Sequence, residues 1–203
     1  MTPRFHQLTY AELNPDSAAL ADEILKVSSA GIGGPYNVLL RSPEMAKRAF
    51  HLLDYLRFHT SVPRHLNEFA ILIQARLANA QFEWWAHYPI ALKFGLRAEL
   101  ADQLREGKRP QGMLADEAAV FDYCVHLSLE HRVSDALFAQ TKAALGEQQL
   151  VDLTVLSGTY VMVAMLLNVA QVGVPDDGRI ALPPIAHDVL RASLLSESIR
   201  THA

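Results

Sequence analysis

Residues 68–87, EFAILIQARLANAQFEWWAH, decide which fold the sequence predicts. The apolar residues of this segment recur at helical spacing, but it also holds three proton-active side chains, Glu68, Glu83 and His87. Burying an unpaired charge costs free energy unless the charge is paired or hydrogen-bonded. We therefore expect the three side chains to form either a structural network or an active site.

Helix geometry indicates that the segment turns back on itself. Glu83 and His87 are four residues apart, so they share one face of a helix. On one straight helix Glu68 would lie roughly 22 Å from Glu83, too far to share a site. A turn at residues 79–81 would instead make a helical hairpin, with an axial offset of roughly 7 Å between Glu68 and His87. Two side chains and one water can span that gap.

The remainder of the chain also predicts helices. Period-two runs rich in Val, Ile and Thr, which are typical of strands, are missing between the turn residues. Asp16 or Ser17 can cap the first helix, Pro43 can begin the second, and Gly95 can end the fourth. We predict an all-α fold with helices at about 16–31, 43–59, 63–80, 82–94, 97–106, 114–130, 134–145, 147–172 and 185–200.

Length and composition favour a single globular domain. The chain has 203 residues, of which 50% are hydrophobic and 20% charged. Its net charge of −4 and the lack of a basic run argue against a nucleic-acid-binding surface. The single cysteine, Cys124, excludes an intramolecular disulfide and fits a reducing compartment. Residues 1–10 lack the apolar core of a signal peptide, so we expect a cytoplasmic protein.

One apolar stretch, residues 155–172, is nearly long enough to span a bilayer. It contains Ser157, Thr159 and Asn168, so we expect a buried core helix or a subunit-interface helix, and no membrane contact. Asp152 stands just inside this long apolar helix, as Glu68 stands inside its own. This correspondence suggests two internal helical repeats, of which the first would carry the chemistry.

Three motifs give the chain a family resemblance. The stretches PRHLNEFAIL (63–72), AQFEWWAH (80–87) and ALKFGL (91–96) together resemble the carboxymuconolactone decarboxylase family, which includes the AhpD-like alkylhydroperoxidases. The resemblance covers about 33–174 and leaves 175–203 as a C-terminal extension of one domain. It implies an AhpD-like helical bundle and a homo-oligomer, either a dimer, a trimer or a hexamer.

The resemblance also implies which chemistry is present. In the peroxidase branch a Glu, a Cys-x-x-Cys pair and a His form a redox and proton relay. Glu68 and His87 fall at the Glu and His positions, while Ala80 and Glu83 occupy the two cysteine positions. The absence of the dithiol argues against thiol peroxidase chemistry, and Glu-x-x-x-His resembles the decarboxylase-like members.

Our leading hypothesis is a cofactor-independent acid–base enzyme, a lyase of decarboxylase or lactone-handling type, that acts on a small carboxylated metabolite. His87 would be the acid or base, Glu83 its orienting partner or a second base, and Glu68 the group that holds a water against His87. The candidate substrate contacts are Trp84, Tyr36 and Arg57.

Three alternatives remain open. A peroxidase-like activity would have to use Cys124 alone. A non-catalytic oligomeric binding protein would use Glu68, Glu83 and His87 only as a structural network. The same three side chains could also form a facial triad for a divalent metal, but one histidine is too few for the usual ligand pattern, so we expect neither metal nor other cofactor.

Overall fold

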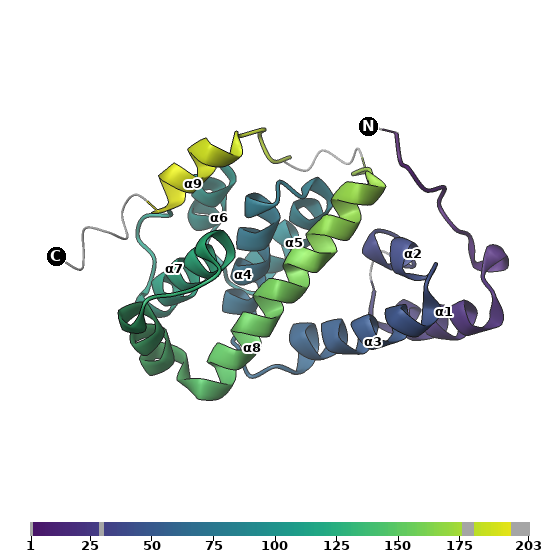
Figure 1. Ribbon diagram of the computed structural model, residues 1–203, viewed down its shortest axis with the longest axis horizontal. Helices are drawn as coiled ribbons and strands as arrows, with labels where there is room; N and C mark the ends of the chain where they lie inside the picture. The colour runs from purple at the N-terminus through teal and green to yellow at the C-terminus, as the bar shows by residue number, and fades with distance from the viewer. Residues whose placement is uncertain (1, 29–30, 176–180, 196–203) are drawn as a thin grey trace.

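The computed structural model describes residues 2–28, 31–175 and 181–195, and these residues form helices without any strand (Figure 1). The all-α prediction is therefore confirmed. The α-helices are α1 (Pro15–Val27), α2 (Pro35–Leu39), α3 (Pro43–Asp54), α4 (Arg64–Leu77), α5 (Gln81–Lys93), α6 (Ala98–Arg105), α7 (Ala115–Glu130), α8 (Asp135–Ala170) and α9 (His187–Leu195). A 3₁₀ turn, η1 (Tyr10–Glu12), and a π-helical stretch, η2 (Tyr55–His59), complete the elements.

The predicted hairpin is formed by α4 and α5. The chain reverses over residues 78–80, where Asn79 adopts a left-handed conformation with φ of 51°. This conformation costs asparagine less than most other residues. The Ala80 amide donates to the Ala75 carbonyl, which closes the turn. The two helices pack against each other along their length, as the segment from Glu68 to His87 requires.

Helix α4 lies at the centre of the bundle and contacts α5, α7 and α8. Its residues Phe69 to Ile73 are fully buried, so the helix is covered on all sides. A run of consecutive apolar residues is expected where neighbouring helices cover a helix on all sides. Glu68 directly precedes this run, so its carboxylate is buried too, and it needs partners.

Helix α8 consists of two helical segments that meet at Gly146, which has non-helical φ and ψ of 80° and 170°. The sequence predicts two helices with a break at the same place. By length and composition α8 is the one helix among the described residues that could cross a membrane, and this alone is weak evidence. One face of α8 packs into the core, whereas Val151, Met165 and Val169 on another face are exposed.

Figure 1 shows α1, α2 and α3 extending from one side of the bundle. Two local predictions in this part are wrong. The α1 cap is Asn14, whose side chain accepts from the Ser17 amide, because Pro15 takes the first helical position. The short helix α2 was expected as a loop, yet Pro35 begins a helix immediately after Gly34. The consequence is that Tyr36 points inward from a helix and is buried.

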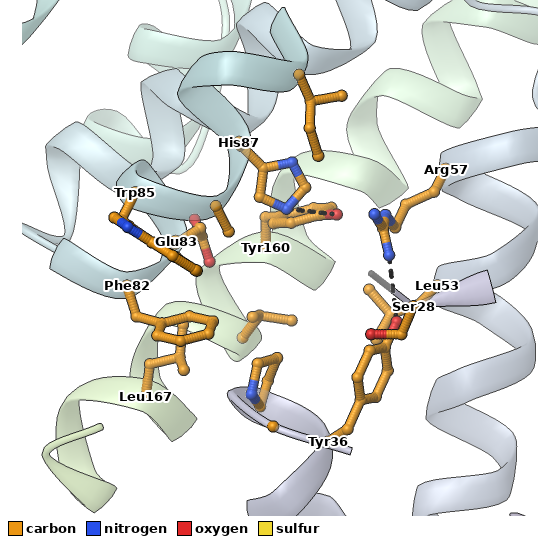
Figure 2. A pocket seen from close by; sticks show the side chains of 15 residues that line it. Ser28, Tyr36, Leu53, Arg57, Phe82, Glu83, Trp85, His87, Tyr160 and Leu167 are labelled. Atoms are coloured by element: carbon orange, nitrogen blue, oxygen red, sulfur yellow. Dashed lines mark hydrogen bonds between the residues drawn. The ribbon is translucent and has the colours of Figure 1, made fainter. Parts of the chain in front are cut away.

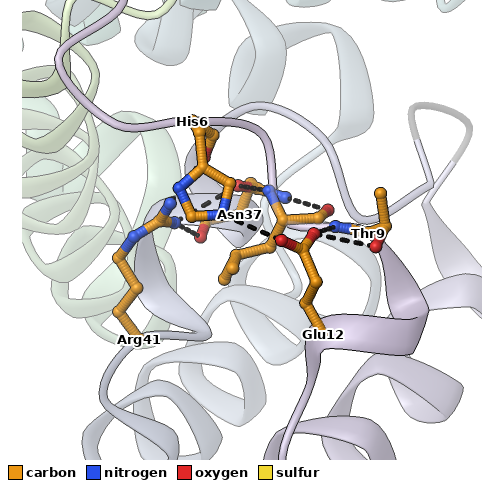
Figure 3. Close-up of polar contacts among 6 residues, drawn as sticks. His6, Thr9, Glu12, Asn37 and Arg41 are labelled. Carbon is orange, nitrogen blue, oxygen red and sulfur yellow. Dashed lines mark hydrogen bonds and ion pairs between the residues drawn. The ribbon is translucent and has the colours of Figure 1, made fainter.

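Side-chain hydrogen bonds join the N-terminal residues 6–8 to α2 and to the turn that follows it (Figure 3). Asn37 Oδ1 accepts from the Leu8 amide and Asn37 Nδ2 donates to the Leu8 carbonyl, both at 3.0 Å. Arg41 donates to the His6 carbonyl at 2.6 Å. The Glu12 carboxylate accepts from the amide and hydroxyl of Thr9. These contacts satisfy the backbone of a segment that has no regular structure of its own.

The C-terminal residues that the structure describes pack back onto the bundle. Gln81 exchanges two hydrogen bonds with the backbone of Leu182, and Leu190 and Leu194 of α9 are buried. The last helix was expected to continue to about residue 200, and residues 196–203 lie outside the described part.

Candidate active site

A cavity of about 230 Å³ lies where α2 and η2 meet α5 and α8. Figure 2 shows side chains from these elements pointing into one space. Most of its wall is apolar, and its polar groups come from five separate parts of the chain. The lining consists of Ser28, Gly33, Pro35, Tyr36, Leu53, Arg57, Phe82, Glu83, Trp85, Ala86, His87, Ile90, Tyr160, Val163 and Leu167.

His87 and Glu68 make direct contact at one wall of this cavity. His87 Nδ1 lies 2.7 Å from Glu68 Oε2, so the bridging water expected from helix arithmetic is not needed. Arg64, one turn earlier on α4, places Nη2 2.7 Å from Glu68 Oε1 as an ion pair. That Oε1 atom accepts no hydrogen bond from the described residues, so Arg64 acts on it chiefly through its charge.

The pair has a defined protonation state. Burial alone would raise the pKa of Glu68, but the contact with His87 and the charges of Arg64 and Arg57 hold it below its usual value. Burial lowers the pKa of His87, and this outweighs the opposite effect of Glu68. Near neutral pH a Glu68 carboxylate therefore accepts from the Nδ1–H of a neutral imidazole, which leaves a lone pair on His87 Nε2.

Tyr160 of α8 faces that lone pair. Its hydroxyl lies 3.4 Å from His87 Nε2, and the two rings are nearly perpendicular with centroids 5.2 Å apart. Burial raises the pKa of Tyr160 well above its usual value, so the phenol keeps its proton and can donate it. Sequence analysis missed Tyr160 because it lies 73 residues from His87, inside an apolar helix that gives no local signal.

Glu83 lines the same cavity but does not contact a polar partner. Its side chain is buried, and neither carboxyl oxygen has a hydrogen-bond partner among the described residues. Burial raises its pKa well above the usual value, so Glu83 is a neutral carboxylic acid near neutral pH. The sequence assigned Glu83 to orient His87 and Glu68 to hold a water, whereas in the structure Glu68 makes the orienting contact.

The candidate substrate contacts differ in their placement. Arg57 and Tyr36 both line the cavity, and Arg57 Nη1 donates to the Tyr36 hydroxyl at 3.2 Å. Trp84 is fully buried outside the lining and stacks near Tyr88, with centroids 5.7 Å apart. Trp85, its neighbour in sequence, lines the cavity instead. Adjacent residues on a helix point about 100° apart, and here Trp84 points into the helix-packing core while Trp85 points to the cavity.

The thiol and metal alternatives are not favoured by the geometry. Cys124 is fully buried outside the cavity lining, where its Sγ lies 3.4 Å from Ser157 Oγ, and burial raises its pKa to about 12. Residues 2–28, 31–175 and 181–195 contain no cluster of three or more His, Cys, Asp or Glu side chains that could hold a metal. In the second half of the suggested repeat, Asp152 accepts from the Thr60 hydroxyl and Asn168 donates to the Ala78 carbonyl, and neither residue lines the cavity.

Comparison with known proteins defines the fold. No protein-family model matches the sequence, and no curated protein matches it. The chain is similar in structure to an uncharacterized peroxidase-related protein from Ralstonia eutropha JMP134, described as an alkylhydroperoxidase AhpD core. The TM-score is 0.71 at 16% sequence identity, over 86% of this chain and 93% of the other. At this identity the likeness concerns the fold alone, and this chain has an AhpD-like helical fold.

Proposed function

We propose that this protein is a cofactor-independent acid–base enzyme of decarboxylase or lactone-handling type that acts on a small carboxylated metabolite. The observation that carries the proposal is the Glu68–His87 pair at 2.7 Å on the wall of a cavity that also contains a neutral, buried Glu83. Burial raises the pKa of Glu83 and lowers that of His87, so the cavity holds one protonated acid and one unprotonated base. Acid–base enzymes usually have such a pair, because one group gives a proton to the substrate and the other takes one.

His87 is suited to act as the base. Glu68 fixes the tautomer in which Nδ1 carries the proton, so Nε2 can accept a proton from the substrate. The imidazolium that forms would be stabilised by the Glu68 carboxylate next to it. Only 8% of the His87 surface is exposed, which limits competition from bulk water.

Glu83 is suited to act as the acid. In a decarboxylation, the bond between the carboxylate and the neighbouring carbon breaks, carbon dioxide leaves, and the remaining electron pair on carbon takes the Glu83 proton. Ionised Glu83 has no hydrogen-bond donor among the described residues, so it readily takes a proton from water when the product leaves, and the cycle consumes one proton for each carbon dioxide released. Apolar walls from Phe82, Val163 and Leu167 make such a site dry, and a dry site favours loss of a carboxylate's charge.

The AhpD-like fold supports the AhpD-like superfamily alone, and the carboxymuconolactone decarboxylase-like part of this proposal rests on the family resemblance of residues 63–96. A homo-oligomer remains a prediction. The exposed apolar face of α8, with Met165 at 66% exposure, supplies a surface that a second copy could cover.

A peroxide-consuming activity is the second candidate, because the structural neighbour is named peroxidase-related. It would have to use Cys124, the single cysteine of the chain. A thiol with a pKa of about 12 is almost entirely protonated near pH 7, and the thiolate is the reactive form. We therefore rank this candidate below acid–base chemistry.

The test is a turnover assay on small lactones and carboxylic acids, with detection of carbon dioxide and of ring opening. His87→Gln and Glu83→Gln should each lower kcat about 10²-fold or more, as expected for loss of a general acid or base. His126→Gln is the matched control, because His126 hydrogen-bonds the Asp122 carbonyl away from the cavity. Full turnover by His87→Gln would refute the proposal.

The same variants separate catalysis from a purely structural role. If Glu68 and His87 only stabilise the fold, Glu68→Gln and His87→Gln should lower the melting temperature without affecting a measured turnover. The proposal expects the opposite result, which is a large loss of kcat in variants that circular dichroism shows to be folded.

A further inference from the structure

The Arg57 end of the cavity holds a charge that the described residues do not balance. The guanidinium makes one hydrogen bond, to the Tyr36 hydroxyl, and no carboxylate of the described residues lies within ion-pair distance of it; the Glu68 carboxylate, which Arg64 pairs, acts on it from farther away. Its Nε atom is shielded from solvent and has no hydrogen-bond partner among them. Figure 2 shows Arg57 pointing into the cavity, with Tyr36 and Ser28 beside it and Glu83 on the far side.

A charge count over the site leaves one positive charge. Glu68 is ionised, and Arg64 at 2.7 Å balances it. His87 is neutral because burial lowers its pKa, and Glu83 is neutral because burial raises its pKa. Arg57 is always protonated, so its charge remains. Partly buried charges without partners are unfavourable in a folded protein, which indicates that a ligand supplies the missing negative charge.

We propose that Arg57 and Tyr36 form a carboxylate-binding subsite, and that the ligand is a small organic acid with a flat apolar body. The inference rests on the proposed function in that it names the substrate class of the same site. One guanidinium presents two parallel N–H donors that match the two oxygens of a carboxylate. Phe82, Trp85 and Leu167 form an apolar wall for the body of the ligand.

The charge count also favours carboxylate over phosphate. A carboxylate brings one negative charge, which cancels Arg57. A phosphate monoester carries close to two at neutral pH and would leave an excess negative charge beside Glu83 and Tyr160. An ion pair with Arg57 stabilises the bound carboxylate, so this carboxylate anchors the ligand while the reacting carbon lies toward His87 and Glu83.

The local backbone explains how Arg57 reaches the cavity. Arg57 belongs to η2, a π-helical stretch at the end of α3, and such stretches frequently occur at functional sites. Thr60, directly after η2, donates to Asp152 of α8 at 2.6 Å, which ties η2 to the helix that carries Tyr160. The Phe58 ring contacts two guanidinium groups, with its centroid 4.7 Å from Cζ of Arg57 and 5.1 Å from Cζ of Arg64.

Binding of benzoate and of benzamide, measured by calorimetry, tests the subsite. The two probes have the same shape, but only benzoate is charged. We expect saturable benzoate binding and about tenfold or greater weakening for benzamide. Arg57→Gln should weaken benzoate by about tenfold or more, and Tyr36→Phe by less, since it removes a single neutral hydrogen bond.

Arg48→Gln is the matched control, because it removes the same charge from an exposed position on α3. Equal affinity for benzoate and benzamide, or unchanged benzoate affinity in Arg57→Gln, would overturn the subsite. Inorganic phosphate that binds at Arg57 more tightly than benzoate would overturn the assignment to carboxylates.

A second readout does not depend on affinity. If Arg57 serves a ligand, ligand-free Arg57→Gln should melt at the same or a higher temperature than the wild type, because an unbalanced charge has been removed. A lower melting temperature would mean that Arg57 has a structural role.

The subsite and the proposed function can fail separately. Arg57-dependent benzoate binding without any His87-dependent turnover would support the subsite and refute the proposed function. His87-dependent turnover of a carboxylic acid or lactone that is unchanged in Arg57→Gln, with no benzoate binding, would refute the subsite and support the proposed function.

Discussion

Glu68 and His87 lie 19 residues apart in the chain, yet His87 Nδ1 is 2.7 Å from Glu68 Oε2. The contact joins the two helices of the α4–α5 hairpin and fixes the imidazole with Nε2 toward the cavity. It is therefore a link between the fold and the chemistry, because the same turn that forms the hairpin brings the two side chains together.

Glu68→Gln should change the His87 imidazole in a way that can be titrated. The Glu68 carboxylate raises the pKa of His87, partly offsetting the effect of burial, so its loss should lower that pKa further. NMR titration of the imidazole carbons would measure the shift. We also expect kcat to fall about 10²-fold or more with little change in KM, because the orientation of the base is lost. An unchanged His87 pKa in Glu68→Gln would contradict the hydrogen bond between Glu68 and His87.

Glu83→Gln should alter the pH dependence of stability. Because the folded pKa of Glu83 lies well above 4.5, the unfolded chain releases this proton at a lower pH than the folded protein does. The wild type should therefore lose stability as the pH rises from about 4.5 through the folded pKa. Gln cannot ionise, so the advantage of Glu83→Gln over the wild type should grow with pH in urea unfolding. Glu44→Gln, at an exposed position, is the control.

The activity of the wild type should fall on the acid side of neutrality. His87 works as a base only when neutral, and its pKa lies below 6.5, so the acid limb of kcat/KM should lie below pH 6.5. The same shift means that stability due to neutral His87 is present above pH 6.5 and is lost as the pH falls through the folded pKa.

In ligand-free Arg57→Gln the His87 pKa should rise, because the Arg57 charge lowers it.

Gly34→Ala should disturb both the backbone and the cavity. Gly34 has φ of 59°, and an added Cβ would lie 2.4 Å from Cε1 of Phe82, which lines the cavity. We expect a loss of about 1–3 kcal/mol in unfolding free energy for each of the two effects. Gly112→Ala separates them, since Gly112 has φ of 75° and open space around it. If Gly34→Ala and Gly112→Ala lose the same unfolding free energy, the Phe82 ring can move away from the added Cβ without destabilising the fold.

Cys124→Ala should leave turnover unchanged. Cys124 lies outside the cavity, and its thiol is buried with a pKa of about 12. The expected cost is confined to stability, about 1 kcal/mol by chemical denaturation. Alkylation of the thiol in the folded protein should be slow compared with the unfolded chain. Loss of peroxide consumption in this variant would instead favour the second candidate function.

Local signals in the sequence predicted much of the fold. Pro43 and Gly95 marked helix ends, and the helical spacing of apolar residues indicated the all-α class and the break near Gly146. Local signals failed where a neighbouring residue competed for the same role. Asn14 caps α1 in place of Asp16 because the proline that follows it fixes the first helical position.

The sequence by itself indicated that Glu68 and His87 meet across a helical hairpin, with Glu83 on the same helix face as His87, because periodicity and the turn at residues 79–81 depend only on near neighbours in the chain. The tertiary structure decided the rest. It gave the orienting contact to Glu68, left Glu83 without a partner, and brought Tyr160 and Arg57 from separate helices into the same cavity. Which of Trp84 and Trp85 faces that cavity also depended on packing, because helix rotation is set by the surrounding helices and not by the segment itself.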